Sequence, residues 1–185
     1  TRGDTMRIHT KKRKNEINQP LKTIIITGAT DGIGKATLIE MLNRGMRVIA
    51  VARNEKKFRT MCESIPQKSK IDFFKADLSQ TSEIFCVSKQ ISNEYSRIDI
   101  LLNNVGGFFS NRFETNEGFE LSLALNYLGP VLLSHLMIPK LSGATNPHII
   151  FVSSSSHRMG KIHTEDLQLR ENYNGIRAYS QSKLA

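Results

Sequence analysis

Short runs of apolar residues alternate along this chain with longer segments in which apolar residues recur at helical spacing. The short runs are TIIIT from Thr23, RVIAVA from Arg47, IDFFKA from Ile71, DILLNN from Asp99 and HIIFVSS from His148. Runs of this length and composition are typical of strands. We therefore predict five strands with helical segments between them.

The segments between the runs have the period of helices. One of them places three apolar residues and a glycine at i, i+3, i+4 and i+7: Leu38, Met41, Leu42 and Gly45. The glycine is placed to end that helix. A later segment has a similar period: Ile84, Val87, Ile91 and Tyr95. Strands that alternate with helices form parallel sheets with right-handed crossovers. We predict an α/β, doubly wound (Rossmann-type) parallel sheet, in the order 3-2-1-4-5 as far as the chain goes.

One segment comes close to the composition of a membrane span. From Leu121 to Pro139 no residue carries a fixed charge. The apolar character of the stretch is interrupted by Asn126, Gly129, Pro130 and His135. A buried helix of the α/β domain is therefore the better interpretation.

Length and composition fit one globular domain, since the chain has 185 residues, of which 39% are apolar and 23% charged. The formal net charge of +9 is concentrated at the N-terminus, where residues 1–22 hold seven basic and two acidic side chains. Its KKRK run, Lys11–Lys14, could contact anionic lipid or nucleic acid, but such runs are more often solvated. We predict that residues 1–21 form a basic, disordered arm, and we expect no nucleic-acid binding.

Cysteine usage indicates the compartment. Cys62 and Cys86 are too few for a disulfide framework or a zinc site, so a reducing environment is expected. The N-terminus lacks the apolar core of a signal peptide, although an anchor upstream of Thr1 stays open. We expect an intracellular protein, either cytoplasmic or associated with the cytoplasmic side of a membrane through the arm or such an anchor.

The turn after the first predicted strand has the residues of a phosphate-binding loop. It is TGATDGIG, Thr27–Gly34, with glycines at 28, 32 and 34. Glycines allow a tight turn and a close approach of a pyrophosphate, while the amides that open the next helix favour anionic oxygens. An ordinary structural turn is the alternative. The loop lies between a strand and a helix, which favours a dinucleotide site.

The end of the second predicted strand indicates which dinucleotide. An acidic residue there would bind a ribose 2′-hydroxyl, but the sequence is AVARNEKK, Ala50–Lys57, with no acid before Arg53. A guanidinium matches a phosphate with two hydrogen bonds. Arg53 therefore favours NADP over NAD, the alternative being a surface arginine at a strand end.

The last eight residues, AYSQSKLA, place Tyr179 and Lys183 four positions apart. On a helix these residues share a face, so the ammonium would lie beside the phenol and favour its anion. Taken alone, such a pair is more often part of an ordinary exposed helical face.

Six motifs occur in register with the predicted strands: TGATDGIG, KADLS, LLNNVGG, LNYLG, FVSSSS and YSQSK. With these motifs, residues 22–185 resemble the short-chain dehydrogenase/reductase family. The long stretch between Ser154 and Tyr179 is similar to that of its retinol-dehydrogenase-like branch.

The resemblance implies roles for particular residues. Tyr179 would be the general acid or base, and Lys183 would stabilise its phenolate and bind the nicotinamide ribose. Ser154 would orient the carbonyl, and Asn126 would hold a water between Lys183 and solvent. The implied cofactor-binding residues are Gly28, Thr30, Asp31, Gly32, Ile33, Gly34, Arg53, Asp77, Leu78, Asn104, Val105 and Gly106, together with Tyr179 and Lys183.

Simpler roles stay open for individual residues. Asn126 could cap or bridge a bent helix, and Ser154 could satisfy an amide at a strand end. Val105 replaces the alanine usual in this motif of the family, and Asp31 stands where some NADP-using members carry a basic residue. NADP preference would then depend on Arg53 alone. His157 and His163 are interpreted as loop histidines, not metal ligands.

The resemblance also implies that the chain is truncated at its C-terminus, because the family has two further strands and a loop that closes over substrate. The helix with Tyr179 and Lys183 is then expected to fray. We predict an NADP-dependent oxidoreductase that acts on a lipophilic carbonyl/alcohol substrate. We also predict that the full-length protein can form a homo-oligomer. The alternative is a non-catalytic nucleotide-binding or interaction module.

Overall fold

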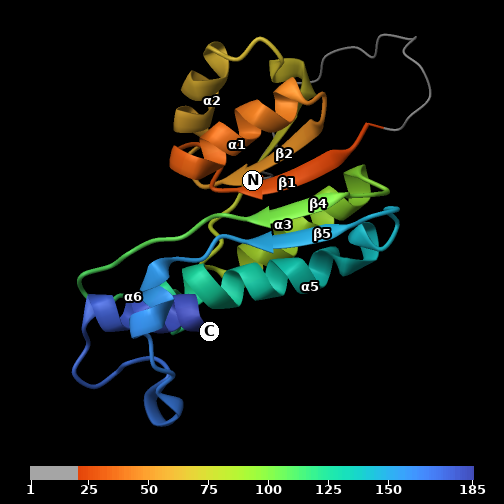
Figure 1. Cartoon of the computed structure of the whole chain (residues 1–185). Coiled ribbons are helices and arrows are strands. Elements are labelled where there is room, and N and C mark those ends of the chain that lie inside the picture. Colours follow the sequence, from red (N-terminus) through yellow and green to blue (C-terminus); the bar gives the residue numbers. More distant parts are fainter. Residues whose placement is uncertain (1–20) are drawn as a thin grey trace, which may run out of the picture.

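Five parallel strands form a single sheet in the computed structural model, which describes residues 21–185 (Figure 1). The strands are β1 (Thr23–Thr27), β2 (Arg47–Ala52), β3 (Ile71–Lys75), β4 (Ile100–Asn103) and β5 (His148–Phe151). Their order is β3-β2-β1-β4-β5, which confirms the predicted α/β topology. The predicted arm, residues 1–21, lies outside the described residues except for Leu21.

Helices cover both faces of the sheet. On one face lie α1 (Gly32–Asn43) and α2 (Glu55–Glu63), and on the other α3 (Thr81–Glu94) and α5 (Gly129–Leu141) (Figure 1). Alternate residues of each central strand therefore enter different cores. Ile25 of β1 packs in the core of α3 and α5, whereas Ile24 and Ile26 pack in the core of α1 and α2.

The predicted helical periods hold, with one correction at a helix end. Gly45 follows α1 with a φ of +80° and donates its N–H to the Leu42 carbonyl at 2.9 Å, so it ends that helix as expected. Tyr95 is not inside α3, which ends at Glu94. Its side chain instead reaches across to Asp72 of β3, and that polar contact sets its position.

The uncharged stretch is a core helix in three parts. It begins with the short helix α4 (Leu121–Leu123), continues through a π-helical turn η2 (Ala124–Leu128) and ends as α5. Within the described part of the chain, Leu121–Leu141 is the one helix whose length and mean hydropathy of 1.5 would suit a membrane span. Leu133 and Met137 are fully buried against the sheet, as predicted for a core helix.

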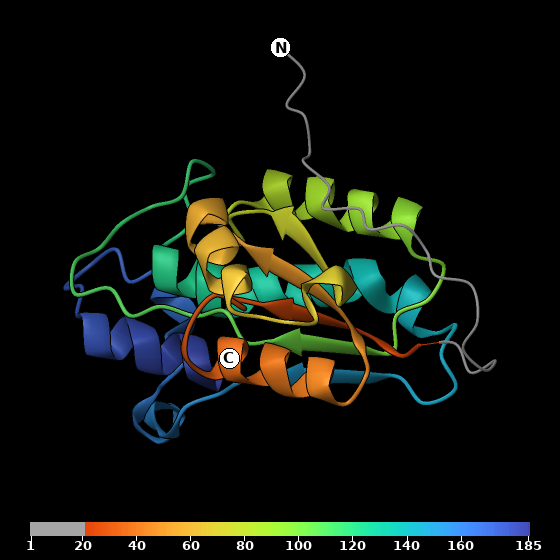
Figure 2. The ribbon, with the colours of Figure 1, turned by 90° about the horizontal axis from the view of Figure 1, so that it is seen from above.

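The remaining elements are short, and most follow β5. They are η1 (Lys68–Lys70) before β3, then η3 (Ser155–Met159), η4 (Thr164–Asp166) and α6 (Gly175–Leu184) after β5. Figures 1 and 2 place α6 beside the beginning of α5, at the end of the sheet where the strands have their carboxyl ends. Ligands bind at this edge in open α/β sheets.

Candidate active site

The glycine loop after β1 folds tightly against its neighbours. Gly28 has a φ of +67°, a conformation that L side chains rarely adopt. A Cβ added at Gly34 would lie 2.3 Å from the Gly28 carbonyl oxygen and 2.5 Å from Asn104 Nδ2. Glycine is therefore required at both positions for the loop to close.

Asp31 caps the helix that this loop opens. Its carboxylate accepts a hydrogen bond from the Gly32 amide at 2.8 Å and lies 2.6 Å from Lys57 Nζ. The pKa of Asp31 is lowered, first by the hydrogen bond from Lys57 and then by the one from the Gly32 amide. Ile33 is exposed and Thr30 partly exposed, so the start of α1 is open to a ligand.

The segment after β4 supports the loop from behind. Asn104 Nδ2 donates to the Thr27 carbonyl at 2.9 Å, and the amides of Asn104 and Val105 donate to Thr27 Oγ1. The side-chain amide of Asn104 thus holds the glycine loop in place. Val105 Cα lies 3.1 Å from the position of a Cβ on Gly28, so this valine fits against a residue that has no side chain.

A cavity of about 280 Å³ lies beside these segments. Its lining residues are Gly28, Thr30, Val51, Ala52, Arg53, Asn54, Lys57, Ala76, Leu78, Val105, Gly106 and Leu125. The walls are mostly apolar, whereas Arg53 and Lys57 supply positive charge. Apolar walls beside the Gly28 turn fit the adenosine half of a dinucleotide.

Six of the fourteen predicted cofactor-binding residues line this cavity: Gly28, Thr30, Arg53, Leu78, Val105 and Gly106. The other eight are not among its lining residues: Asp31, Gly32, Ile33, Gly34, Asp77, Asn104, Tyr179 and Lys183. Asp77 has a local role as well, since its Oδ1 accepts hydrogen bonds from the Ser79 amide and hydroxyl. Its Oδ2 lies 3.5 Å from Arg53. Lys57 was not among the predicted residues, although its spacing of four positions from Arg53 could have indicated it.

Tyr179 and Lys183 lie on α6, which Asn174 caps. Lys183 Nζ lies 5.9 Å from the centre of the Tyr179 ring and donates to the Val152 carbonyl at 3.1 Å. Burial lowers the pKa of Lys183. The ring of Phe108 meets the Tyr179 ring edge to face, with centres 6.0 Å apart. The predicted pair therefore does share one face of a helix.

Asn126 connects three segments of the site from the π-helical turn. Its Oδ1 accepts from the Gly107 amide at 2.8 Å, and its Nδ2 donates to the Gly107 carbonyl and to Ser182 Oγ, both at 2.9 Å. Irregular turns of this kind occur often at functional sites. The side chain joins the segment after β4 to α6, and the predicted water at Asn126 stays a prediction.

Ser154 follows β5 and caps η3, with its hydroxyl accepting from the Ser156 amide at 3.2 Å. This is the local role that the sequence left open, and the partly exposed hydroxyl can serve a ligand as well. The turn packs closely on α6, since a Cβ on Gly160 would lie 2.5 Å from the Ser180 carbonyl oxygen. Of the two loop histidines, His157 is exposed and His163 contacts Arg177 of α6.

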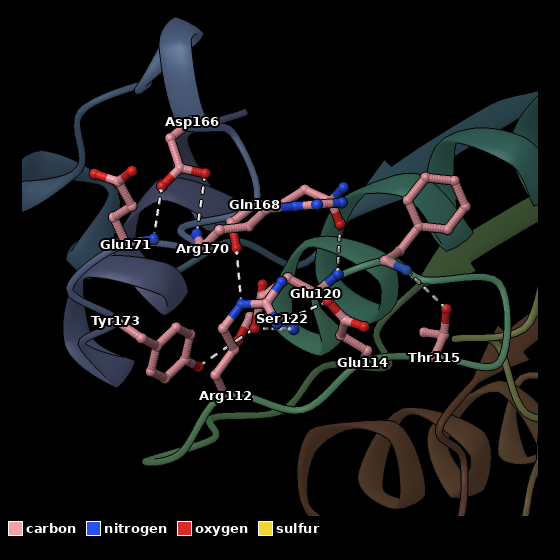
Figure 3. A network of polar contacts seen from close by, with 11 residues as sticks. Arg112, Glu114, Thr115, Glu120, Ser122, Asp166, Gln168, Arg170, Glu171 and Tyr173 are labelled. Atoms are coloured by element: carbon pink, nitrogen blue, oxygen red, sulfur yellow. Dashed lines mark hydrogen bonds and ion pairs between the residues drawn. The ribbon is translucent and has the colours of Figure 1, made fainter.

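A polar network centred on Glu120 joins the two long loops of the site (Figure 3). One runs from β4 to α4 (residues 104–120) and the other from β5 to α6 (residues 152–174). Glu120 is 2% exposed, and its carboxylate accepts from the amides of Ser122 and Leu123 at 2.8 and 2.7 Å. Tyr173 Oη lies 3.3 Å from Glu120 Oε1, and the Glu120 amide donates to Gln168 Oε1 at 3.0 Å. The sequence did not predict this network. The capping of α4 by Glu120 involves neighbouring residues, but its contacts with Gln168 and Tyr173 join residues far apart in the chain.

Comparisons with known proteins agree with this geometry. A family model described as short chain dehydrogenase matches residues 22–166. The chain belongs to the short-chain dehydrogenase family.

Relatives of this short-chain dehydrogenase include human retinol dehydrogenase 11, which is 36% identical over 172 residues, covering 91% of this chain and 54% of the relative. The chain thus spans about half the length of the curated relatives it matches. An uncharacterized protein from Mycobacterium paratuberculosis has a similar structure, with a TM-score of 0.77 and 31% identity over 88% of this chain and 57% of the other. A Sphingobium yanoikuyae short-chain dehydrogenase in complex with NADPH has a TM-score of 0.69 and 25% identity over 89% and 60%.

Proposed function

We propose that this short-chain dehydrogenase is the NADP-binding and catalytic part of an oxidoreductase that interconverts carbonyl and alcohol groups. The observation that supports it best is the arrangement around residues 104–107. This segment supports the glycine loop through Asn104, lines the nucleotide cavity at Gly106, and is joined through Asn126 to the helix of Tyr179 and Lys183. A cavity that fits the adenosine half of the cofactor and a candidate acid/base pair thus share one structural support.

In this proposal Tyr179, Lys183 and Ser154 have different roles in the interconversion of the carbonyl and the alcohol. The cofactor, when bound, supplies or accepts the hydride. Tyr179 gives a proton to the carbonyl oxygen during reduction and removes it from the alcohol in the reverse direction. Lys183, half-buried beside the ring, favours the phenolate, and Ser154 holds the substrate oxygen.

The preference for NADP follows from charge at the cavity. Arg53 and Lys57 both line it, and no acid ends β2, where one would bind a ribose 2′-hydroxyl. The Sphingobium relative described above was solved with NADPH. These observations support NADP as the cofactor of this chain, with NAD as the weaker candidate.

A lipophilic substrate fits the surroundings of Tyr179. Phe108 contacts its ring, and Ile176 lies one turn before it on α6. Both are large apolar side chains more than half exposed, at 54% and 60%. The retinol dehydrogenases among the relatives act, by their names, on a lipophilic alcohol. Self-association and membrane contact of a longer protein stay predictions.

The cofactor proposal is tested by titrating the chain with NADPH and with NADH and following nucleotide fluorescence. We expect tighter binding of NADPH. Arg53→Asp removes a phosphate partner and adds a ribose acceptor, so NADPH affinity should fall about 10-fold or more. An unchanged ratio of the two affinities would show that Arg53 does not recognise the 2′-phosphate, and binding of neither nucleotide would favour the alternative of an interaction module.

A further inference from the structure

Two cations at the nucleotide cavity are each paired with an acid from another segment of the chain. Lys57 Nζ lies 2.6 Å from Asp31, and Arg53 lies 3.5 Å from Asp77. Both cations line the cavity, but neither acid does. The Lys57 pair is the closer of the two and connects α2 to the glycine loop.

Lys57 is positioned by its own helix. Asn54 caps α2 and accepts a hydrogen bond from the Lys57 amide at 2.9 Å, which places this lysine in the first turn. Arg53 lies between the last residue of β2, Ala52, and the cap residue Asn54. Arg53, the cap residue Asn54 and Lys57 all line the cavity, and two cations at one cavity favour a doubly charged anion.

Asp31 has a second role that keeps it in place. Its carboxylate caps α1 through the Gly32 amide, so it cannot move away with Lys57 without leaving that amide unpaired. A nucleotide that ends in a ribose hydroxyl leaves the Asp31–Lys57 pair intact. A nucleotide with a 2′-phosphate competes with Asp31 for the same ammonium.

We propose that Lys57 is a second specificity-determining residue for the 2′-phosphate and that Asp31 opposes it by holding the ammonium in the free protein. The inference rests on the proposed binding of NADP and deepens it. Discrimination between the two cofactors then depends on two cations and one competing acid, whereas the sequence had indicated Arg53 alone.

The test is a double-mutant cycle on the 185-residue chain, with NADPH and NADH titrations for Lys57→Met, Asp31→Asn and the double variant. Lys57→Met should weaken NADPH binding about 10- to 100-fold, the usual range for one hydrogen bond to a charged group, and change NADH binding less than about 2-fold. Asp31→Asn should tighten NADPH by about 2- to 5-fold, because exposed ion pairs have energies of this size. Asparagine caps helices as well as aspartate does, so α1 should be retained.

Lys56→Met is the matched control, since Lys56 is the exposed neighbour that does not line the cavity. It removes the same charge and should leave the ratio of NADPH to NADH affinity unchanged. In the Lys57→Met background, Asp31→Asn should no longer tighten NADPH.

Three results would overturn the inference. Equal losses for NADPH and NADH in Lys57→Met would mean that the lysine acts on the fold or on a shared part of both nucleotides. Tightening by Asp31→Asn that persists without Lys57 would mean that Asp31 only repels the phosphate at a distance. Binding of neither nucleotide by the unmodified chain would overturn the proposed function itself, and this inference with it.

Discussion

The central strand β1 and the edge strand β5 both lead into functional loops, yet their surroundings are opposite. All five residues of β1 are buried, with β2 and β4 on either side. All four residues of β5 are exposed, and within the described residues β5 pairs with β4 alone. The glycine loop therefore extends from a rigid strand, whereas Ser154 extends from one with few contacts of its own.

The β5 side obtains its order from long-range polar contacts instead of strand burial. Glu120 connects the loop before α4 to Gln168 and Tyr173 of the loop before α6 (Figure 3). Asn126, in the π-helical turn that follows α4, connects that turn to α6 through Ser182. A buried network of this kind stabilises its region only when each member has its partners. The strand that leads to the nucleotide loop is thus fixed by core packing, whereas long-range hydrogen bonds join the segments around the catalytic helix.

The largest expected effect is the loss of catalysis when the hydroxyl of Tyr179 on α6 is removed. Because the chain spans half the length of its relatives, turnover is measured after extending it beyond Ala185 with the corresponding part of human retinol dehydrogenase 11. Tyr179→Phe should lower carbonyl reduction about 10²- to 10⁴-fold, the usual contribution of a positioned general acid. NADPH binding should stay nearly unchanged, and a parallel loss of binding would contradict the role of Tyr179.

Truncating an isoleucine in each strand compares the two regions directly. Ile25→Ala removes a fully buried side chain from β1 and should lower the free energy of unfolding by about 2–5 kcal/mol. Ile149→Ala acts on a β5 side chain that is 40% exposed, and should cost less than about 1 kcal/mol. Urea unfolding measures both. Equal losses would show that β5 is as well packed as β1.

Removing the Glu120 carboxylate tests the network. Glu120→Ala leaves the amides of Ser122 and Leu123 without their acceptor and should cost about 1–3 kcal/mol in unfolding free energy. Glu171→Ala, at an exposed position nearby, serves as the control and should change stability by less than about 0.5 kcal/mol. Hydrogen exchange should quicken in residues 160–174 for the Glu120 variant, and unchanged exchange there would argue against the network.

The smallest effect concerns the charge of Lys183. Burial disfavours its ammonium, so its pKa is lowered in the folded protein. Between this lowered pKa and the ordinary value of about 10.4, the unfolded chain binds the proton more tightly. The contribution of Lys183 to the free energy of unfolding therefore rises with pH across that window. Lys183→Met should remove this rise in urea unfolding as the pH approaches 10.5 from below, and identical slopes would contradict it.

The sequence by itself determined the strands and helices and the two motifs whose residues are close together in the chain. Strand runs, the glycine turn and the Tyr179–Lys183 spacing depend on neighbours a few positions apart, where backbone geometry fixes which side chains share a face. Asn126 and Ser154 were found only through family resemblance. The sequence did not predict that their side chains accept hydrogen bonds from the backbone amides of Gly107 and Ser156.

Only the tertiary structure decided which distant groups meet. Asp31 pairs with a lysine 26 positions away, and Glu120 contacts a glutamine 48 positions away. No periodic pattern encodes such pairs, because a hydrogen bond requires its atoms within about 3 Å, and the packing of α1, α2 and the two long loops sets that separation. The sequence therefore indicated what each segment can bind, and packing decided which charges oppose one another at the cavity.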